Sequence, residues 1–241
     1  PGFVDGERHR TGLFSEPVKE SIRVTDRWLS MLFDALRDAG IENETDFVVL
    51  SDHGHLNICR TVCPNVFFAD AGLIRTKEDG ELAAWDAYCA SCALSGHVYL
   101  SRPDDEELKN RVYDMLQKMA DEKIYGFERV FTKEEVRERY GLDGDFSFVI
   151  ETDGFTTFSD DWRRPVVRDL DTSDYRFGHS THGHMPEKGP QPPFIGMGPS
   201  FAPGVVLEEG HILNHAPTFA RILGVELLQA EGKCEDRLLR K

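Results

Sequence analysis

The sequence predicts a mixed α/β sandwich with a smaller inserted lobe. An amphipathic helix runs into a short apolar strand near the start, a stretch with its own helices and strands occupies the middle, and a strand followed by a helix returns near the end. Helices and strands in this order bury their apolar faces against one another in layers. With 241 residues the chain can form one such domain and a lobe. We therefore expect the main domain at residues 1–59 and 171–241, and an α+β lobe at residues 60–170.

The first part of the chain is expected to form a loop, a helix and a strand. Residues 1–14 are rich in Gly, Asp, Arg and His and show no periodicity, which predicts a loop. Ser15 can cap the helix that follows, whose apolar stripe continues to Leu36 and which Gly40 ends. The continuous apolar run at 47–50 predicts a buried, parallel strand. Polar residues follow this strand directly, and ligands bind at such strand ends in α/β sheets.

The lobe and the last part of the chain carry several short patterns. Turn residues between apolar runs predict a hairpin, apolar stripes at helical spacing predict helices, and Thr and Glu three positions apart predict a capping box. The predicted elements are a hairpin turn at 78–80, strands at 97–100, 146–150 and 194–197, helices at 108–119 and 214–223, and a capping box of Thr132 and Glu135.

The charge of the chain limits its partners. The formal net charge is −15, from 43 acidic and 28 basic residues. Such a surface repels polyanions, so we do not expect a long nucleic acid as partner. A small-molecule phosphate ester or a nucleotide can still bind where metal ions fix positive charge locally. No apolar run reaches the roughly 18 residues of a spanning helix, so no membrane span is expected in this chain.

The five cysteines do not have the pattern of a disulfide framework. Their odd number favours a reducing compartment and a cytoplasmic location. Cys59 and Cys63, with Cys89 and Cys92, have spacings that suit a second zinc site or a redox pair. We expect instead that Cys89 and Cys92 are small buried residues on a helix, because they continue a helical spacing that includes Trp85.

Three segments hold residues of the kinds that bind metal ions. The first contains Asp5 and His9, the second Asp52 and His53 before a glycine, and the third His182. Carboxylate oxygen and imidazole nitrogen together suit Zn²⁺ or a similar divalent ion. Because Asp5 and His9 stand four apart, one helical turn would direct both at a single ion. Asp52 and His53 would diverge in a regular strand, but the glycine after them lets the backbone turn.

Further histidines lie near these segments. His179 and His184 flank His182, and we expect them to lie around the metal site or to face solvent. His55 is a candidate for the lining of the pocket, but its place one residue past the turn favours a structural role.

The order of the three segments resembles the type I phosphodiesterase/nucleotide pyrophosphatase family of the alkaline phosphatase superfamily. In this chain the order is a D-x-x-x-H segment, then an apolar strand that runs into S-D-H-G, and then H-G ahead of a P-x-F-I-x-x-G-P strand. Residues 181–199 are similar to the family over their whole length, and residues 214–224 match its closing helix. The resemblance runs from about Asp5 to Val225 and is weakest in the middle lobe. It implies an alkaline-phosphatase-like three-layer sandwich that is partial here, with its N-terminal part expected upstream of Pro1.

The resemblance also implies two divalent metal ions, with zinc expected and manganese as the alternative. Asp5, His9 and His182 would bind the first ion, and Asp52 and His53 the second. The family's Thr or Ser nucleophile and one further Asp ligand have no counterpart here and are expected upstream of this chain. We therefore assign no nucleophile to a residue of the chain, and expect the chain alone to be inactive.

The implied activity is metal-dependent hydrolysis of phosphodiester or pyrophosphate bonds in small molecules, with nucleotides as the expected substrates, through a phospho-Thr or phospho-Ser intermediate. Because every metal ligand must be unprotonated, activity should rise from acid toward neutral and alkaline pH. The alternatives within the superfamily are a phosphomonoesterase, a phosphonate hydrolase and a phosphomutase. A non-catalytic metal-binding fragment is the alternative from another class.

Overall fold

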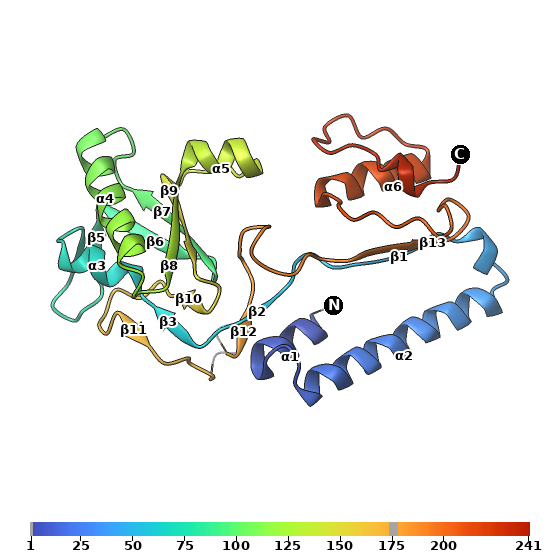
Figure 1. The fold of residues 1–241 in the computed structure, drawn as a ribbon, viewed down its shortest axis with the longest axis horizontal. Coiled ribbons are helices and arrows are strands. Elements are labelled where there is room, and N and C mark those ends of the chain that lie inside the picture. The colour runs from blue at the N-terminus through green and yellow to red at the C-terminus, as the bar shows by residue number, and fades with distance from the viewer. Residues whose placement is uncertain (1, 174–177) are drawn as a thin grey trace. The chain divides into compact units, whose positions relative to one another are not determined.

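A computed structural model describes residues 2–173 and 178–241 of the chain (Figure 1). The chain folds into two compact units, each made of two segments. The first unit comprises Pro1–Ile22 and Gly54–Pro190, and the second comprises Arg23–His53 and Gln191–Lys241. Compactness does not decide which segment is an insertion, so the division into main domain and lobe expected from the sequence stays a prediction.

The first unit is organised around a four-stranded antiparallel sheet in the order β6-β7-β9-β8. Its strands are β6 (Ala87–Ser91), β7 (Ser95–Leu100), β8 (Phe127–Thr132) and β9 (Phe148–Thr152). The strands predicted at 97–100 and 146–150 are confirmed as β7 and β9.

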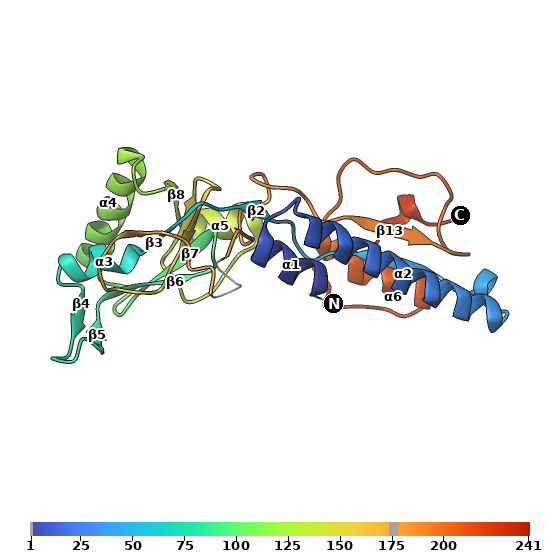
Figure 2. The ribbon, with the colours of Figure 1, turned by 90° about the horizontal axis from the view of Figure 1, so that it is seen from below.

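Both faces of this sheet are covered by helices. The helices are α3 (Pro64–Asp70), α4 (Glu106–Glu122) and α5 (Lys133–Tyr140). Successive side chains of a strand point to opposite faces, and accordingly Phe148 and Ile150 of β9 belong to one buried cluster and Val149 to another. Helices α3 and α4 pack in the first cluster and lie next to each other in Figures 1 and 2, whereas α5 contributes Val136 to the second. Every residue of β9, the charged Glu151 included, is therefore buried.

Local sequence signals in the first unit are confirmed. The helix predicted at 108–119 is α4, and Thr132 and Glu135 form the predicted capping box at the start of α5. Short strands complete the unit: β2 (Leu56–Asn57), β3 (Arg60–Val62), β4 (Ile74–Thr76), β5 (Leu82–Trp85), β10 (Thr156–Phe158), β11 (Val167–Arg168) and β12 (Ser180–Thr181). The predicted hairpin is the antiparallel pair β4–β5, and β2 pairs with β12.

The start of the chain is a helix, α1 (Phe3–Thr11), so the prediction of a loop over residues 1–14 is wrong. The helix has no apolar stripe, and the contacts within it are polar. Arg10 forms an ion pair with Glu7 at 2.9 Å, and the Thr11 hydroxyl donates to the Glu7 carbonyl at 2.7 Å. Such contacts leave no periodic hydrophobic signal in the sequence.

The second unit contains a sheet of two strands with a helix on each face. Its elements are the later part of α2 (Glu16–Asp38), β1 (Phe47–Leu50), β13 (Phe194–Met197), α6 (His215–Leu223) and short 3₁₀ helices at Glu42–Glu44, Ile212–Asn214 and Asp236–Leu238. The register of β1 on β13 directs Phe47 and Phe194 to opposite faces. Phe33 of α2 packs on Phe47 with ring centroids 4.6 Å apart, and Phe219 of α6 packs on Phe194 at 6.1 Å. The helix, the sheet and the second helix therefore form three layers within this unit (Figure 1).

The direction and burial of β1 differ from the prediction, although its existence and those of α2, β13 and α6 are confirmed. In the described chain β1 pairs antiparallel with β13, and Leu50 at its end is exposed. A short apolar run indicates a strand but contains no information about the direction of its neighbour.

The cysteine segment is also corrected. Cys89 lies on strand β6 and Trp85 on β5, so the helical spacing was coincidental. All five cysteines are free; Cys63 and Cys89 are buried, and Cys59 and Cys92 are exposed. Within residues 2–173 and 178–241, no helix combines the length and the apolar character needed to cross a bilayer.

Candidate metal centre

Helix α1 presents the first two predicted metal ligands on one face. Asp5 and His9 stand one turn apart, and Oδ1 of Asp5 lies 3.4 Å from Nε2 of His9. Zn²⁺ with bonds of about 2.0–2.1 Å in tetrahedral geometry holds its ligand atoms about 3.4 Å from one another. The separation of the two atoms therefore fits a shared ion.

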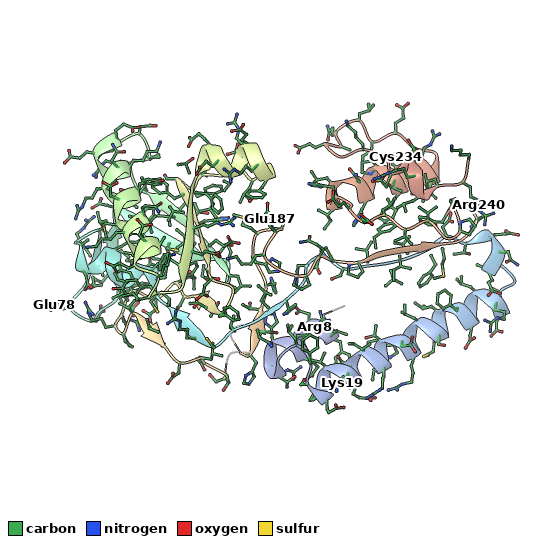
Figure 3. The ribbon with its side chains drawn as sticks, in the orientation of Figure 1. Arg8, Lys19, Glu78, Glu187, Cys234 and Arg240 are labelled. Atoms are coloured by element: carbon green, nitrogen blue, oxygen red, sulfur yellow. The ribbon has the colours of Figure 1, made fainter. Side chains whose placement is uncertain are left out.

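The backbone of Ser180 orients the ring of His9. Nδ1 of His9 lies 2.7 Å from the Ser180 carbonyl oxygen, and since a carbonyl can only accept, Nδ1 carries the proton. The lone pair of the ring is then on Nε2, the nitrogen that faces Asp5. Two further bonds fasten α1 to this strand: the His179 amide donates to the His9 carbonyl at 2.7 Å, and the Ser180 hydroxyl donates at 2.7 Å to the carbonyl of Arg8, which is labelled in Figure 3.

His182 follows β12 on a turn that requires glycine. The His182 carbonyl accepts the Leu94 amide at 3.2 Å, and the Gly183 carbonyl accepts the Ser95 hydroxyl at 2.7 Å. Gly183 has a φ of 92°, and a side chain there would begin 2.0 Å from the Cys92 carbonyl oxygen. The His-Gly pair of the sequence therefore has a physical basis, because only glycine lets this loop approach the end of β6.

The structure brings the three predicted ligands of the first metal together. The ligand atoms of Asp5, His9 and His182 all lie within 4.8 Å of one another, and the rings of His9 and His182 have centroids 5.3 Å apart. Their donor set, one carboxylate and two imidazoles, suits Zn²⁺ or a similar ion.

His55 lies in the same cluster, although the sequence favoured a structural role for it over a place in the lining of the pocket. It is 2% exposed, and its Nε2 lies 2.8 Å from Asp5 Oδ1 while its Nδ1 lies 3.3 Å from Ser180 Oγ. Burial is the main cause that lowers the pKa of His55 to about 4, against the hydrogen bond to Asp5. The available sequence signal was its position two residues after His53, inside the strongest metal-binding segment.

Asp52 and His53 lie in the second unit, directly after β1. Their side chains lie close to each other: Nε2 of His53 lies 3.5 Å from Oδ2 of Asp52. The Ser51 hydroxyl donates to the His53 carbonyl at 2.9 Å and stabilises the turn. Asp52 has a side chain that is 81% exposed, so its carboxylate is accessible to an ion.

The two histidines that flank His182 take other positions. The amide of His179 serves the backbone of α1, and Nδ1 of His184 lies 2.9 Å from the Met185 carbonyl. Among the described residues, no cysteine lies in a group of side chains that could hold a metal ion.

Comparison with known proteins identifies the family. The family model of type I phosphodiesterase / nucleotide pyrophosphatase matches residues 3–184. The chain belongs to this family. Among solved structures the chain is similar to human ectonucleotide pyrophosphatase / phosphodiesterase 5 (ENPP5), with 18% identity, a TM-score of 0.69, and coverage of 98% of this chain and 56% of that one.

Two further relatives within the family are structures of murine ENPP5. One has 17% identity and the other, an inactive form in complex with AMP, has 18%; both have a TM-score of 0.65 and are covered over 56% of their length by 98% of this chain. No curated protein matches the sequence. The likeness confirms the predicted fold class: an alkaline-phosphatase-like α/β fold, of which the chain contains a part that spans about half of these relatives.

Proposed function

We propose that this chain supplies the metal-binding part of a hydrolase that cleaves phosphodiester or pyrophosphate bonds in small molecules, with nucleotides as substrates. The proposal rests on one observation above all: Asp5, His9 and His182 converge to within 4.8 Å in a member of this family. The AMP complex of murine ENPP5 supports a nucleotide as the ligand.

We propose that two divalent ions bind, and that both are zinc, with manganese as the alternative. Asp5, His9 and His182 would hold one ion, and Asp52 and His53 the other. A bound divalent ion would stabilise the negative charge that develops on phosphoryl oxygens. The chain's own contribution is to fix the ligands: the Ser180 carbonyl sets the tautomer of His9.

The nucleophile is proposed to be a Thr or Ser upstream of Pro1, together with one further Asp ligand. The chain without that part is expected to bind metal but to hydrolyse nothing, because the hydroxyl proposed to attack phosphorus lies upstream of Pro1. The cytoplasmic location stays a prediction.

The test compares the complete protein with two variants on an aryl nucleotide diester, a bis-aryl phosphate and an aryl monophosphate. His9→Ala should lose the first ion and at least about 100-fold in kcat/KM, since a first-site ligand is gone. His211→Asn is the matched control: His211 is exposed and accepts the Leu213 amide, a role that Asn also performs. Metal content measured on the same samples should fall only for His9→Ala.

The outcomes separate the alternatives. A preference for the monophosphate would replace the diester assignment by a phosphomonoesterase. Metal binding without hydrolysis by the complete protein would indicate a non-catalytic binding module, and wild-type activity in His9→Ala would overturn the proposed metal site.

A further inference from the structure

A fourth side chain shares the candidate metal centre and has no role in the proposed function. His55, from the segment just before β2, is buried beside Asp5, and its ring lies 4.8 Å from that of His9 and 5.3 Å from that of His182 by centroid. Burying an imidazole is unfavourable unless its polar atoms find partners.

The contact between His55 and Asp5 is a hydrogen bond with a defined direction. Nε2 of His55 lies 2.8 Å from Oδ1 of Asp5, and a carboxylate oxygen accepts, so Nε2 donates its proton. The same oxygen lies 3.4 Å from Nε2 of His9. Because a carboxylate oxygen has two lone pairs, Oδ1 can accept from His55 and face an ion beside His9 at the same time.

Ser180 relates the two imidazoles to each other. Its carbonyl accepts from Nδ1 of His9, and its Oγ lies 3.3 Å from Nδ1 of His55. One residue of β12 thus contacts the ring that faces the ion and the ring that holds the carboxylate. Asp5 has a side chain that is 36% exposed, so without His55 its carboxylate would be free to rotate toward solvent.

We propose that His55 is a positioning residue of the metal centre, which holds Oδ1 of Asp5 in the orientation that lets Asp5, His9 and His182 share one ion. The inference rests on the metal binding proposed above and adds a residue that was not among the predicted metal ligands. Hydrogen-bond partners of metal ligands typically change metal affinity by about 10–100-fold.

The test measures the Zn²⁺ dissociation constant of the complete protein by competition with a chromophoric chelator. His55→Met fills the space without a donor and should weaken binding by about 10–100-fold. His55→Gln restores an N–H near the position of Nε2 and should recover most of the affinity. The Co²⁺ absorption spectra of wild type and His55→Gln should coincide, because the ligand set is unchanged. His211→Asn is the control, and thermal unfolding without metal reports folding.

Each result of this test either supports or overturns the proposed role of His55. Unchanged affinity in His55→Met, with lost affinity in His9→Ala, would overturn this inference alone. Affinity in His55→Gln as weak as in His55→Met would overturn the donor role and indicate that the ring binds the ion itself. If His55→Met does not fold, His55→Asn replaces it, since its shorter amide cannot reach Asp5. A wild-type protein that binds no Zn²⁺ would overturn the proposed function itself.

Discussion

Replacing Glu151 by Ala removes a carboxylate that is fully buried at the end of β9 and should destabilise the first unit by about 3 kcal/mol. Its Oε1 accepts the Met185 amide at 3.0 Å, and its Oε2 lies 3.6 Å from Nζ of Lys188. The neighbouring loop residue Glu187, labelled in Figure 3, accepts from the Tyr140 hydroxyl at 3.1 Å. These contacts fasten the loop that follows His182 to strand β9 and helix α5.

The magnitude follows from the two contacts that are lost. A buried amide left without its acceptor costs about 1–3 kcal/mol. Breaking a buried ion pair from one side costs about 3–5 kcal/mol, but Lys188 keeps Glu128 and the Thr152 carbonyl as partners, which reduces this term. Glu128→Ala is the matched control, because Glu128 also pairs with the Lys188 ammonium but has a side chain that is 46% exposed. This substitution should cost at most about 1 kcal/mol.

Urea unfolding followed by tryptophan fluorescence measures both variants, because Trp85 and Trp162 report on the first unit. Equal losses in the two variants would refute the reasoning, since burial would then not distinguish the carboxylates. A loss below about 1 kcal/mol in Glu151→Ala would refute it as well.

Three further predictions concern pH, the His182 loop and a helix start. Because folding lowers the pKa of His55 from 6.5 to about 4, the unfolded chain takes up a proton on this ring at a higher pH than the folded chain does. The folded state of the metal-free protein should therefore lose about 3 kcal/mol of stability as the pH falls from 6.5 to about 4, measured by urea unfolding at each pH. His55→Met should remove this dependence of stability on pH. Gly183→Ala places a methyl group 2.0 Å from a carbonyl oxygen and should weaken Zn²⁺ binding more than tenfold in chelator competition. Gly210→Ala, whose methyl group would have nothing within 4 Å, should leave the affinity unchanged. Equal affinities in the two variants would contradict the steric argument. Thr132→Ala should cost about 1 kcal/mol in thermal unfolding through the lost cap of α5, and no change would show that the cap is redundant.

The existence of elements with a local sequence pattern could be predicted, but their pairing with distant partners could not. The stripes of α2 and α4 and the capping box of α5 are written in neighbouring residues, and all three are present. Helix α1 lacks a stripe, and its bonds to β12 are polar contacts with residues far along the chain, which leave no periodic signal in the sequence. The cysteines of β6 coincided with a helical spacing that their strand does not use.

The site follows the same division. The family resemblance, which rests on the order of the three segments, implied that Asp5, His9 and His182 share one ion, and the structure places their ligand atoms within 4.8 Å of one another. The sequence made His55 a candidate for the lining of the pocket, but its contact with Asp5 was not predicted, because the two residues are 50 positions apart and no spacing rule connects them.

The proton on His9 is fixed by a main-chain oxygen rather than by a side chain. Substitution at position 180 can therefore delete the hydroxyl but cannot delete the group that selects the tautomer. The pairing of β12 with β2, in which Ser180 lies opposite Asn57 and Thr181 opposite Leu56, holds this carbonyl in place and so maintains the tautomer of His9. The orientation of His9 therefore places no constraint on the identity of residue 180 during evolution. A shift of one residue in the register of β12 on β2 would instead turn the Ser180 carbonyl away and leave the His9 ring without a preferred tautomer.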